Sequence, residues 1–333
     1  MPPPDVIVVG ASAGGVEALT RFVRGLPPGL PAAIAVVLHT SPTGPSLLPN
    51  ILARAGALPA RAATDGENFL PGHIYVSSPD HHLLVKPNRT LRVVRGPQEN
   101  RHRPAIDPLF RSAAQAFESR VIGVLLSGTL DDGTAGLYAI KESGGVTIVQ
   151  DPDEAIAPGM PRNALKHVQI DYCLPAQGIA SLMGELTSSS TPLKEPVPHY
   201  DPATAKEIKI AEFDMAEINS ADKPGSPSVF TCPDCSGTLF EISAGDVSRY
   251  RCRVGHAYSP ENVLKAQGAA LDRALWTALR MLEERIAFLR LMALRAETSQ
   301  NQTVARDFAA RKKELEEQAG AIRTILMKAD YQA

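Results

Sequence analysis

The sequence predicts an α/β protein built on a doubly wound, mainly parallel sheet. The first observation is a continuous apolar run, Val6–Val9, which is typical of a strand buried on both faces of a parallel sheet. The second is a change of period from Val16 onward, where the apolar residues fall on one face of a helix. The third is repetition, because similar strand and helix patterns alternate as far as residue 186.

The later elements follow from the same patterns. Buried strands are expected at 34–38, 121–126, 146–149 and 168–171. Helices are expected at 42–53, 107–117, 134–142 and 161–166. Short strands predict a hairpin-like insertion at 74–76, 83–85 and 91–94. Ligands bind at the carboxyl ends of the strands in such sheets, so the residues that follow the strands are the candidate site residues.

Length and composition divide the chain into four parts. A chain of 333 residues accommodates one sizeable domain and something smaller. Residues 187–228 are rich in Ser, Thr and Pro, which predicts a linker, with one short strand at Ile208–Phe213. The predicted parts are the α/β domain at 1–186, the linker at 187–228, a small module at 229–258 and helices at 259–333.

Charge and hydropathy exclude several classes of protein. The formal net charge of −2 implies no general attraction to nucleic acid or to an anionic membrane. No apolar run approaches the ~20 residues that span a bilayer, and Met1–Asp5 lacks the features of a signal peptide. Three of the four cysteines lie in a metal-type pattern and not in a disulfide framework. We therefore expect a cytoplasmic protein without membrane insertion.

The turn after the first strand reads Gly-Ala-Ser-Ala-Gly-Gly at 10–15. Its glycines permit a tight strand-to-helix turn that lifts the Ser12 hydroxyl off the end of the sheet. The backbone N–H groups of Ala13, Gly14 and Gly15 then lie at a helix N-terminus and can form an oxyanion hole. Two alternatives stay open for this stretch alone: a dinucleotide-binding loop, in which Ser12 replaces the middle glycine, and a structural turn with an incidental serine.

Two other strand ends carry groups that suit a nucleophilic serine. His39 ends the second strand, and Asp131 and Asp132 follow the strand at 121–126. A histidine near its ordinary pKa can accept the serine proton, and a carboxylate can hold the histidine tautomer. Taken singly, such a histidine is more often a surface residue, and Asp before Gly is often turn chemistry. Their joint appearance with Ser12 at three strand ends favours catalysis.

These motifs together resemble the catalytic domain of the CheB-type protein-glutamate methylesterases of bacterial chemotaxis. The resemblance rests on the 10–15 turn, on His39 and on Ser127-Gly-Thr-Leu-Asp-Asp-Gly133. Supporting segments are Gly72-His-Ile-Tyr-Val-Ser-Ser-Pro-Asp-His-His82, His102-Arg-Pro-Ala-Ile-Asp-Pro-Leu-Phe110 and Gly159-Met-Pro161. It covers residues 5 to about 186. It implies that Ser12 is the nucleophile, His39 the base and Asp132 the orienting carboxylate, because the family's aspartate directly precedes the glycine.

The resemblance also implies a reaction and its partners. The reaction is hydrolysis of a γ-glutamyl methyl ester on a protein through an acyl-enzyme, without a catalytic cofactor, and glutamine deamidation would use the same groups. The implied partners are a methylated chemoreceptor, or another methyl-esterified signalling protein, and a chemotaxis methyltransferase. Candidate substrate-binding residues are Arg101 and Arg103, with Thr129 and Met160 near the site. The cationic loop of Arg101 and Arg103 either contacts an acidic substrate helix or is an ordinary solvated loop.

Two departures from the family pattern matter. The family usually has Met then Gly where this chain has Thr129 and Leu130, so the floor of the site is expected to differ. Family members usually carry an N-terminal receiver domain, whereas this chain begins four residues before the first strand. We therefore expect no receiver domain and no control by phosphorylation in the same chain.

A second strong pattern is Cys232-Pro-Asp-Cys235 followed by Cys252-Arg-Val-Gly-His256. Two ligand pairs at this separation resemble a zinc ribbon, in which Cys232, Cys235, Cys252 and His256 close a tetrahedron around Zn²⁺. A module of about 30 residues has too little core to fold alone, so the metal would supply folding energy. With four protein ligands the site is expected to be structural. A redox role for Cys232 and Cys235 is the weaker alternative, because no thioredoxin-like βαβ pattern surrounds them.

The C-terminal part predicts two long amphipathic helices. Apolar residues recur at steps of mostly three and four, from Leu264 to Ala293 and again from Val304 to Leu326. We expect these helices to form a hairpin or a coiled coil, and their apolar stripe packs within the protein or joins a second copy in a homo-oligomer. The competing function is a methylesterase-like adaptor, weakened at Thr129 and Leu130, in a two-component signalling complex. A zinc-ribbon nucleic-acid binder finds little support in the near-neutral charge.

Overall fold

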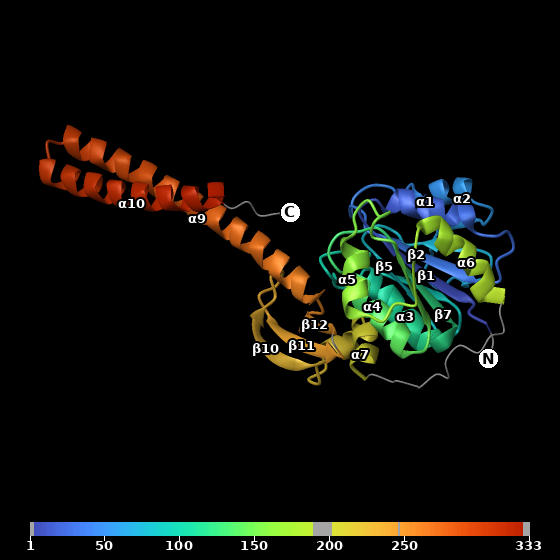
Figure 1. Cartoon of the computed structure of the whole chain (residues 1–333). Helices are drawn as coiled ribbons and strands as arrows, with labels where there is room; N and C mark the ends of the chain where they lie inside the picture. The colour runs from blue at the N-terminus through green and yellow to red at the C-terminus, as the bar shows by residue number, and fades with distance from the viewer. Residues whose placement is uncertain (1–2, 189–201, 246, 329–333) are drawn as a thin grey trace. The chain divides into compact units, whose positions relative to one another are not determined.

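The computed structural model describes residues 3–188, 202–245 and 247–328 and has two compact units, Met1–Val263 and Leu264–Ala333. The centre of the first unit is a sheet flanked by helices (Figure 1). It has seven strands in the order β3-β4-β2-β1-β7-β8-β9. Every neighbouring pair in it is parallel. Its strands are β1 (Val6–Ala11), β2 (Ala33–Leu38), β3 (Ala60–Ala62), β4 (Ile74–Val76), β7 (Val121–Leu125), β8 (Val146–Gln150) and β9 (Tyr172–Leu174). The doubly wound parallel sheet predicted from the sequence is confirmed.

Helices cover both faces of the sheet, and each face has its own core. Ile7 and Val9 of β1 pack with α1 (Gly15–Gly25), α2 (Leu48–Ala55) and α6 (Ala176–Ser188). Val6 and Val8 point to the other face and pack with α3 (Ile106–Phe117), α4 (Thr134–Glu142) and α5 (Gly159–His167). This division explains the continuous apolar run, because alternate residues of one strand are buried on opposite sides. Of the three short strands predicted as a hairpin-like insertion, β5 (His82–Val85) and β6 (Leu91–Val94) pair as a hairpin. The third, β4, instead pairs in parallel with β2 and β3 in the main sheet, so its expected place in the insertion was wrong.

Three further predicted elements were wrong in place or type. The last strand of the sheet is β9 and not 168–171, and the helix expected at 42–53 begins only at Leu48, after a loop with Pro42, Gly44 and Pro45. The strand expected at Ile208–Phe213 lies largely in helix α7 (Pro202–Ala211), which α8 (Met215–Asn219) follows. Ile208 and Ala211 recur at a spacing of three residues and pack on Leu84 of β5, which favours a helix.

The segment around the cysteines forms a four-stranded antiparallel sheet in the order β10-β11-β12-β13. The strands are β10 (Ser226–Thr231), β11 (Thr238–Ala244), β12 (Val247–Cys252) and β13 (Ala257–Tyr258). β11 and β12 make an antiparallel hairpin between the two ligand pairs. We call this part, residues 226–258, the ribbon module.

Buried charges join the ribbon module to the α/β domain. Glu207 of α7 is fully buried and accepts hydrogen bonds from Arg249 at 2.6 Å and Arg251 at 3.1 Å, both on β12. Arg251 also donates to Glu99 at 2.7 Å, and Glu99 accepts from Arg111 of α3 at 2.5 Å. All five residues are at most 5% exposed. Three guanidinium groups thus surround two carboxylates in a site that water does not screen.

Removing one carboxylate from this network should destabilise the fold strongly. Glu207→Ala leaves Arg249 without its carboxylate partner in a buried site, so we expect a loss of about 3–5 kcal/mol in the free energy of unfolding. Glu212→Ala is the matched control, because Glu212 forms only a partly exposed ion pair with Lys86 worth about 1 kcal/mol or less. Urea unfolding monitors both variants. Equal, small losses would contradict a stabilising role for the network.

The second unit is a helical hairpin formed by most of α9 (Pro260–Thr298) together with α10 (Gln302–Lys328). Leu279 of α9 and Leu315 of α10 are buried, and Arg323 pairs with Glu283 across the two helices at 2.6 Å. The two amphipathic helices predicted from the apolar period are present. Across residues 3–188, 202–245 and 247–328, every helix is too short or too polar to cross a lipid bilayer.

Candidate active site

Ser12 lies in the turn between β1 and α1, beside the point where the strand order reverses between β1 and β7. Gly14 makes this turn possible: its φ of 71° is left-handed, and a Cβ atom there would lie 2.6 Å from the Ile156 side chain. The Ser12 N–H donates to the Ser127 carbonyl oxygen at 2.8 Å, which fixes the turn to the end of β7. The Ser12 side chain therefore has a defined place at the carboxyl edge of the sheet and is half-buried.

His39 lies directly after β2, and its backbone N–H donates to the Ala11 carbonyl oxygen at 3.1 Å. Its Nδ1 is 3.1 Å from the Ser12 Oγ, and its Nε2 is 2.7 Å from the Asp132 Oδ2. A neutral imidazole with its proton on Nε2 satisfies both contacts, because Nε2–H donates to the carboxylate and Nδ1 accepts from the hydroxyl. The three side chains thus form a continuous hydrogen-bonded chain.

Asp132 is buried and accepts several hydrogen bonds besides that of His39. The Ile106 N–H donates at 2.7 Å, the Gly133 N–H at 3.0 Å and the Asn100 side-chain amide at 2.8 Å. Burial alone would raise the pKa of Asp132, but these donors and His39 hold the pKa of this carboxyl well below its usual range. Asp132 is therefore ionised at neutral pH, as a group that orients an imidazole requires.

A second histidine lies against the first. The His102 ring stacks on the His39 ring with centroids 3.7 Å apart and an interplanar angle of 9°. Burial, and the proximity of His39, lower the pKa of His102 to about 4. His102 is therefore uncharged at neutral pH and confines the His39 ring without repelling it. The sequence motifs mark the segment that begins at His102 but do not predict this contact, because no spacing relates residues 39 and 102.

Asp107 is a further buried carboxyl group beside the hydrogen-bonded side chains of Ser12, His39 and Asp132. It accepts from the Gly136 N–H at 2.7 Å and from the Asn100 amide at 3.0 Å. Burial, followed by the nearby Asp132 charge, raises the pKa of Asp107 to about 8. Asp107 thus favours the neutral form at pH 7, which limits the negative charge that accumulates around Asp132.

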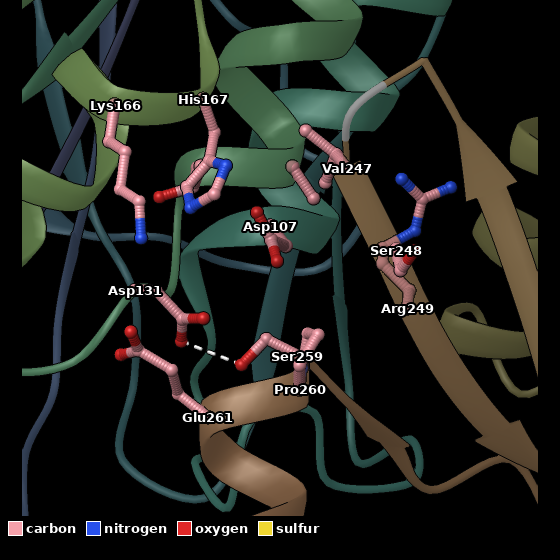
Figure 2. A pocket seen from close by; sticks show the side chains of 12 residues that line it. Asp107, Asp131, Lys166, His167, Val247, Ser248, Arg249, Ser259, Pro260 and Glu261 are labelled. Atoms are coloured by element: carbon pink, nitrogen blue, oxygen red, sulfur yellow. Dashed lines mark hydrogen bonds between the residues drawn. The ribbon is translucent and has the colours of Figure 1, made fainter.

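Asp131, the alternative carboxylate in the sequence, points away from His39 toward residues after the ribbon module. Its Oδ1 accepts from the Ser259 hydroxyl at 2.7 Å and from the Asn262 amide at 2.7 Å. Figure 2 shows the contact with Ser259. Both residues line a cavity of about 300 Å³. Burial raises the pKa of Asp131 to about 6, with Glu261 and Asp132 adding to the rise.

This raised pKa predicts a pH-dependent stability difference. The unfolded chain loses the Asp131 proton near pH 3.8 and the folded chain near pH 6, so ionisation of Asp131 lowers stability as the pH rises through this window. Asp131→Asn keeps an oxygen acceptor but cannot ionise. As the pH rises from 4 to 7, we expect the free energy of unfolding of Asp131→Asn to increase by about 2 kcal/mol relative to that of the unsubstituted chain. Urea unfolding at both pH values measures this, and a constant difference would contradict the assignment.

The candidate substrate-binding residues differ in their exposure and in the hydrogen bonds that they make. Arg101 is exposed, whereas Arg103 donates to the Asp80 carboxylate at 2.6 Å and to the Gly96 carbonyl oxygen at 2.6 Å. Met160 is fully buried, and a Cβ atom at Gly128 would lie 2.0 Å from its sulfur and 2.9 Å from the Ser12 Cβ. Met160 and Ser12 therefore both pack against Gly128, which places Met160 close to the serine turn. Thr129 is exposed beside them.

Leu130 shows the effect of the departure from the family pattern. Its φ is 63°, in the left-handed region that a glycine adopts without strain. Leu130 thus adopts a backbone conformation that its side chain disfavours, at one of the two positions where the sequence departs from the family pattern.

The four metal-ligand candidates come together in the ribbon module. The potential ligand atoms of Cys232, Cys235, Cys252 and His256 all lie within 4.8 Å of one another. The Cys235 and Cys252 sulfurs are 3.6 Å apart, and each of the Cys232 and Cys252 sulfurs lies 3.7 Å or less from the His256 Nδ1. A tetrahedral zinc site has ligand–ligand edges of about 3.6–3.8 Å, so the four residues fit such an ion.

Taken together, the sheet and the serine–histidine–aspartate chain at its switch point are typical of a serine-type hydrolase. A family model described as CheB methylesterase matches residues 7–183. The chain belongs to the CheB methylesterase family, whose named members are carboxylic ester hydrolases.

Named relatives and a solved structure agree with this family. A putative protein-glutamate methylesterase/protein-glutamine glutaminase of Leptospira interrogans is 35% identical over 186 residues, which cover 56% of this chain and 96% of the relative. The protein-glutamate methylesterase/protein-glutamine glutaminase 2 of Pseudomonas aeruginosa is 36% identical over 54% of this chain and 52% of the relative. The crystal structure of the Thermotoga maritima CheB methylesterase catalytic domain matches with a TM-score of 0.53 and 33% identity, and covers 55% of this chain and 98% of that one.

Proposed function

We propose that this protein hydrolyses γ-methyl esters of glutamate residues in chemoreceptor-like signalling proteins and deamidates glutamine residues with the same groups. The observation that carries the proposal is the hydrogen-bonded chain from Ser12 through His39 to Asp132, inside the part of the chain that the family model covers. The relatives' names supply the substrate class, a protein glutamate ester.

In the proposed mechanism Ser12 is the nucleophile. Its Oγ attacks the ester carbonyl carbon while His39 Nδ1, 3.1 Å away, takes the hydroxyl proton. Asp132 stabilises the imidazolium that forms, because its ionised carboxylate accepts a hydrogen bond from the Nε2–H group. The tetrahedral intermediate then breaks its bond to the methoxy oxygen, which leaves as methanol with the proton from His39. Water attacks the acyl-enzyme in the same way and releases the glutamate carboxylate.

Backbone N–H groups at the start of α1 would stabilise the oxyanion. Of the three candidates Ala13, Gly14 and Gly15, the Gly15 N–H already donates to the Ser12 carbonyl oxygen at 2.8 Å. The N–H groups of Ala13 and Gly14 are therefore the better donors in this proposal. They lie at a helix N-terminus, where the helix dipole favours negative charge.

We assign a structural Zn²⁺ to Cys232, Cys235, Cys252 and His256. The ligand–ligand distances suit a tetrahedral ion, and a set of four protein ligands leaves no open position for substrate. Tyr258 supports the site, because its hydroxyl lies 3.3 Å from the Cys232 sulfur and donates to Asp234. When bound, the ion supplies folding energy to the ribbon module and no catalytic chemistry.

The proposed partner is a methylated chemoreceptor, or another methyl-esterified signalling protein, in the same system as a methyltransferase. Exposed Arg101 is the candidate for contact with an acidic substrate helix, while Arg103, held by Asp80, shapes the loop. The cytoplasm is the proposed compartment, since free thiols in a metal-type cluster suit a reducing environment. Exposed Met281 and Phe288 on α9 are candidates for contact with a second copy.

The alternative is a methylesterase-like adaptor without turnover, and the departure at Thr129 and Leu130 is the observation that favours it. Receptor treated with the full chain distinguishes the two proposals when methylated glutamate and glutamine peptides are quantified by mass spectrometry. Loss of methyl groups with the unsubstituted chain and not with Ser12→Ala supports the enzyme. Binding of the receptor without any loss of methyl groups supports the adaptor.

A further inference from the structure

Asn100 contacts both the candidate triad and the ribbon module. It is 3% exposed, and its side-chain amide donates to Asp132 at 2.8 Å and to Asp107 at 3.0 Å. Its backbone carbonyl oxygen lies 2.6 Å from Nδ1 of His102, the ring that stacks on His39. One buried residue thus supports the carboxylate of the triad directly and the imidazole of the triad through a neighbour.

The remaining two polar groups of Asn100 are bound by residues that follow the metal-ligand candidate His256. The Asn100 N–H donates to the Ala257 carbonyl oxygen at 2.8 Å, and its side-chain oxygen accepts from the Ser259 N–H at 2.9 Å. Because the amide oxygen is held by Ser259, the amide nitrogen must face the side chains of Asp132 and Asp107. The orientation that serves Asp132 therefore depends on residues 257–259.

A parallel contact links the neighbouring aspartate to the same segment. The Ser259 hydroxyl donates to Asp131, the residue before Asp132 (Figure 2). Ser259 also accepts from the Asn262 N–H at 3.2 Å as α9 begins, and Asn262 donates to Asp131. The loop that carries Asp132 is thus held at two points by the end of the ribbon module and the start of α9.

The metal site lies one residue from these contacts. The Cys252 N–H donates to the His256 carbonyl oxygen at 2.9 Å and the Gly255 N–H to the Cys252 carbonyl oxygen at 3.0 Å, which closes the turn that carries two ligand candidates. A small antiparallel sheet with so few core residues depends on its metal for a fixed conformation. If this turn loosens, Ala257 and Ser259 lose their fixed places and Asn100 loses both partners.

We infer that Asn100 is a positioning residue of the esterase site and that the metal-loaded ribbon module holds it in place, so that the C-terminal module completes the site formed by residues 1–186. The inference rests on the proposed roles of Ser12, His39 and Asp132. It assigns the module a task beyond its own folding: metal loading sets the hydrogen bonds that Asp132 accepts.

The first test removes the metal from the unsubstituted full chain with EDTA and restores it with Zn²⁺. Two readouts are followed: kcat on methylated receptor, and the downfield proton resonance of the His39 Nε2–H that is bonded to Asp132. We expect metal removal to lower kcat about 10- to 100-fold, the size that small misplacements of catalytic groups produce, with little change in KM. The resonance should shift or broaden, and Zn²⁺ should restore both. An unchanged resonance and kcat in metal-free protein would overturn the inference.

The second test asks whether the effect of the metal passes through Asn100. Asn100→Ala should lower kcat by a similar factor in the loaded protein, and metal removal should then cause little further loss, because residues that act through one contact are not additive. Asn88→Ala, in the exposed turn between β5 and β6, is the control and should keep the full response to metal. Equal responses to metal in Asn100→Ala and the control would overturn the inference.

The two readouts separate this inference from the proposed function. If the loaded, unsubstituted chain releases no methyl groups, the proposed function fails, whereas the His39 resonance still reports whether the metal orders the triad. If Asn100→Ala does not fold, the metal removal and restoration on the unsubstituted chain remain decisive.

Discussion

Ser12→Ala should abolish ester hydrolysis, with a fall in kcat of at least about 10⁴-fold, while the chain stays folded. The serine supplies the atom that bonds to the acyl carbon, and no other hydroxyl contacts His39 Nδ1 among the described residues. Alanine removes one oxygen from a half-buried turn whose backbone bonds, such as that from the Ser12 N–H to Ser127, remain. Kinetics on methylated receptor measure the loss, and circular dichroism monitors the fold.

A matched control separates loss of the nucleophile from a general effect of removing a serine. Ser41→Ala changes an exposed serine two residues after His39 whose hydroxyl contacts only Thr43 among the described residues, so its rate should be unchanged. A serine-directed fluorophosphonate should label the unsubstituted chain and Ser41→Ala on Ser12, and should not label Ser12→Ala. Retention of most activity by folded Ser12→Ala would refute the assigned nucleophile.

The second large effect is expected from Cys252→Ala. Cys252 is buried, and its sulfur lies 3.6 Å from the Cys235 sulfur and 3.6 Å from His256 Nδ1. Structural zinc contributes about 10–16 kcal/mol in zinc-finger peptides, far more than a module of this size can replace by packing. We expect about one zinc per unsubstituted chain and a large loss of zinc in Cys252→Ala, together with rapid proteolysis within residues 226–258.

Cys173→Ala provides the control for this change. Cys173 lies on β9, is exposed, and takes no part in the metal-ligand cluster. It should retain the zinc and the resistance to protease of the unsubstituted chain. Protein purified without chelator that contains no zinc, or a Cys252→Ala variant that keeps its zinc, would contradict the metal assignment.

The candidate triad could be read from the sequence because topology alone brings it together. Ser12, His39 and the Asp131–Asp132 pair each follow an apolar strand, and the parallel strands β1, β2 and β7 are neighbours in the sheet. Carboxyl ends of parallel strands share one edge, so three strand ends define one site. The metal-ligand candidates could also be predicted from the sequence, because the spacing within each pair is typical of a tight metal-binding turn.

The residues that support the triad could not be predicted in this way. Asn100 lies in an irregular loop, with φ at 49°, and its partners Ala257 and Ser259 are about 160 positions further along the chain. No period or spacing relates them. The buried pair of Glu207 with Arg249 also depends on α7, a segment that its alternating apolar residues Ile208 and Ile210 had suggested was a strand. Contacts between segments so far apart in the sequence leave no pattern in the local sequence of either segment.

The most direct test of the account is to treat a methylated chemoreceptor with the full chain in water enriched in ¹⁸O and to follow both products. Attack of Ser12 on the acyl carbon predicts methanol without ¹⁸O and one ¹⁸O atom in each newly formed glutamate carboxylate, because water enters only when the acyl-enzyme opens. Ser12→Ala should yield neither product. Methanol that carries ¹⁸O, or a receptor left fully methylated by folded, zinc-loaded chain, would contradict the proposal that this site is a serine-dependent glutamate methylesterase.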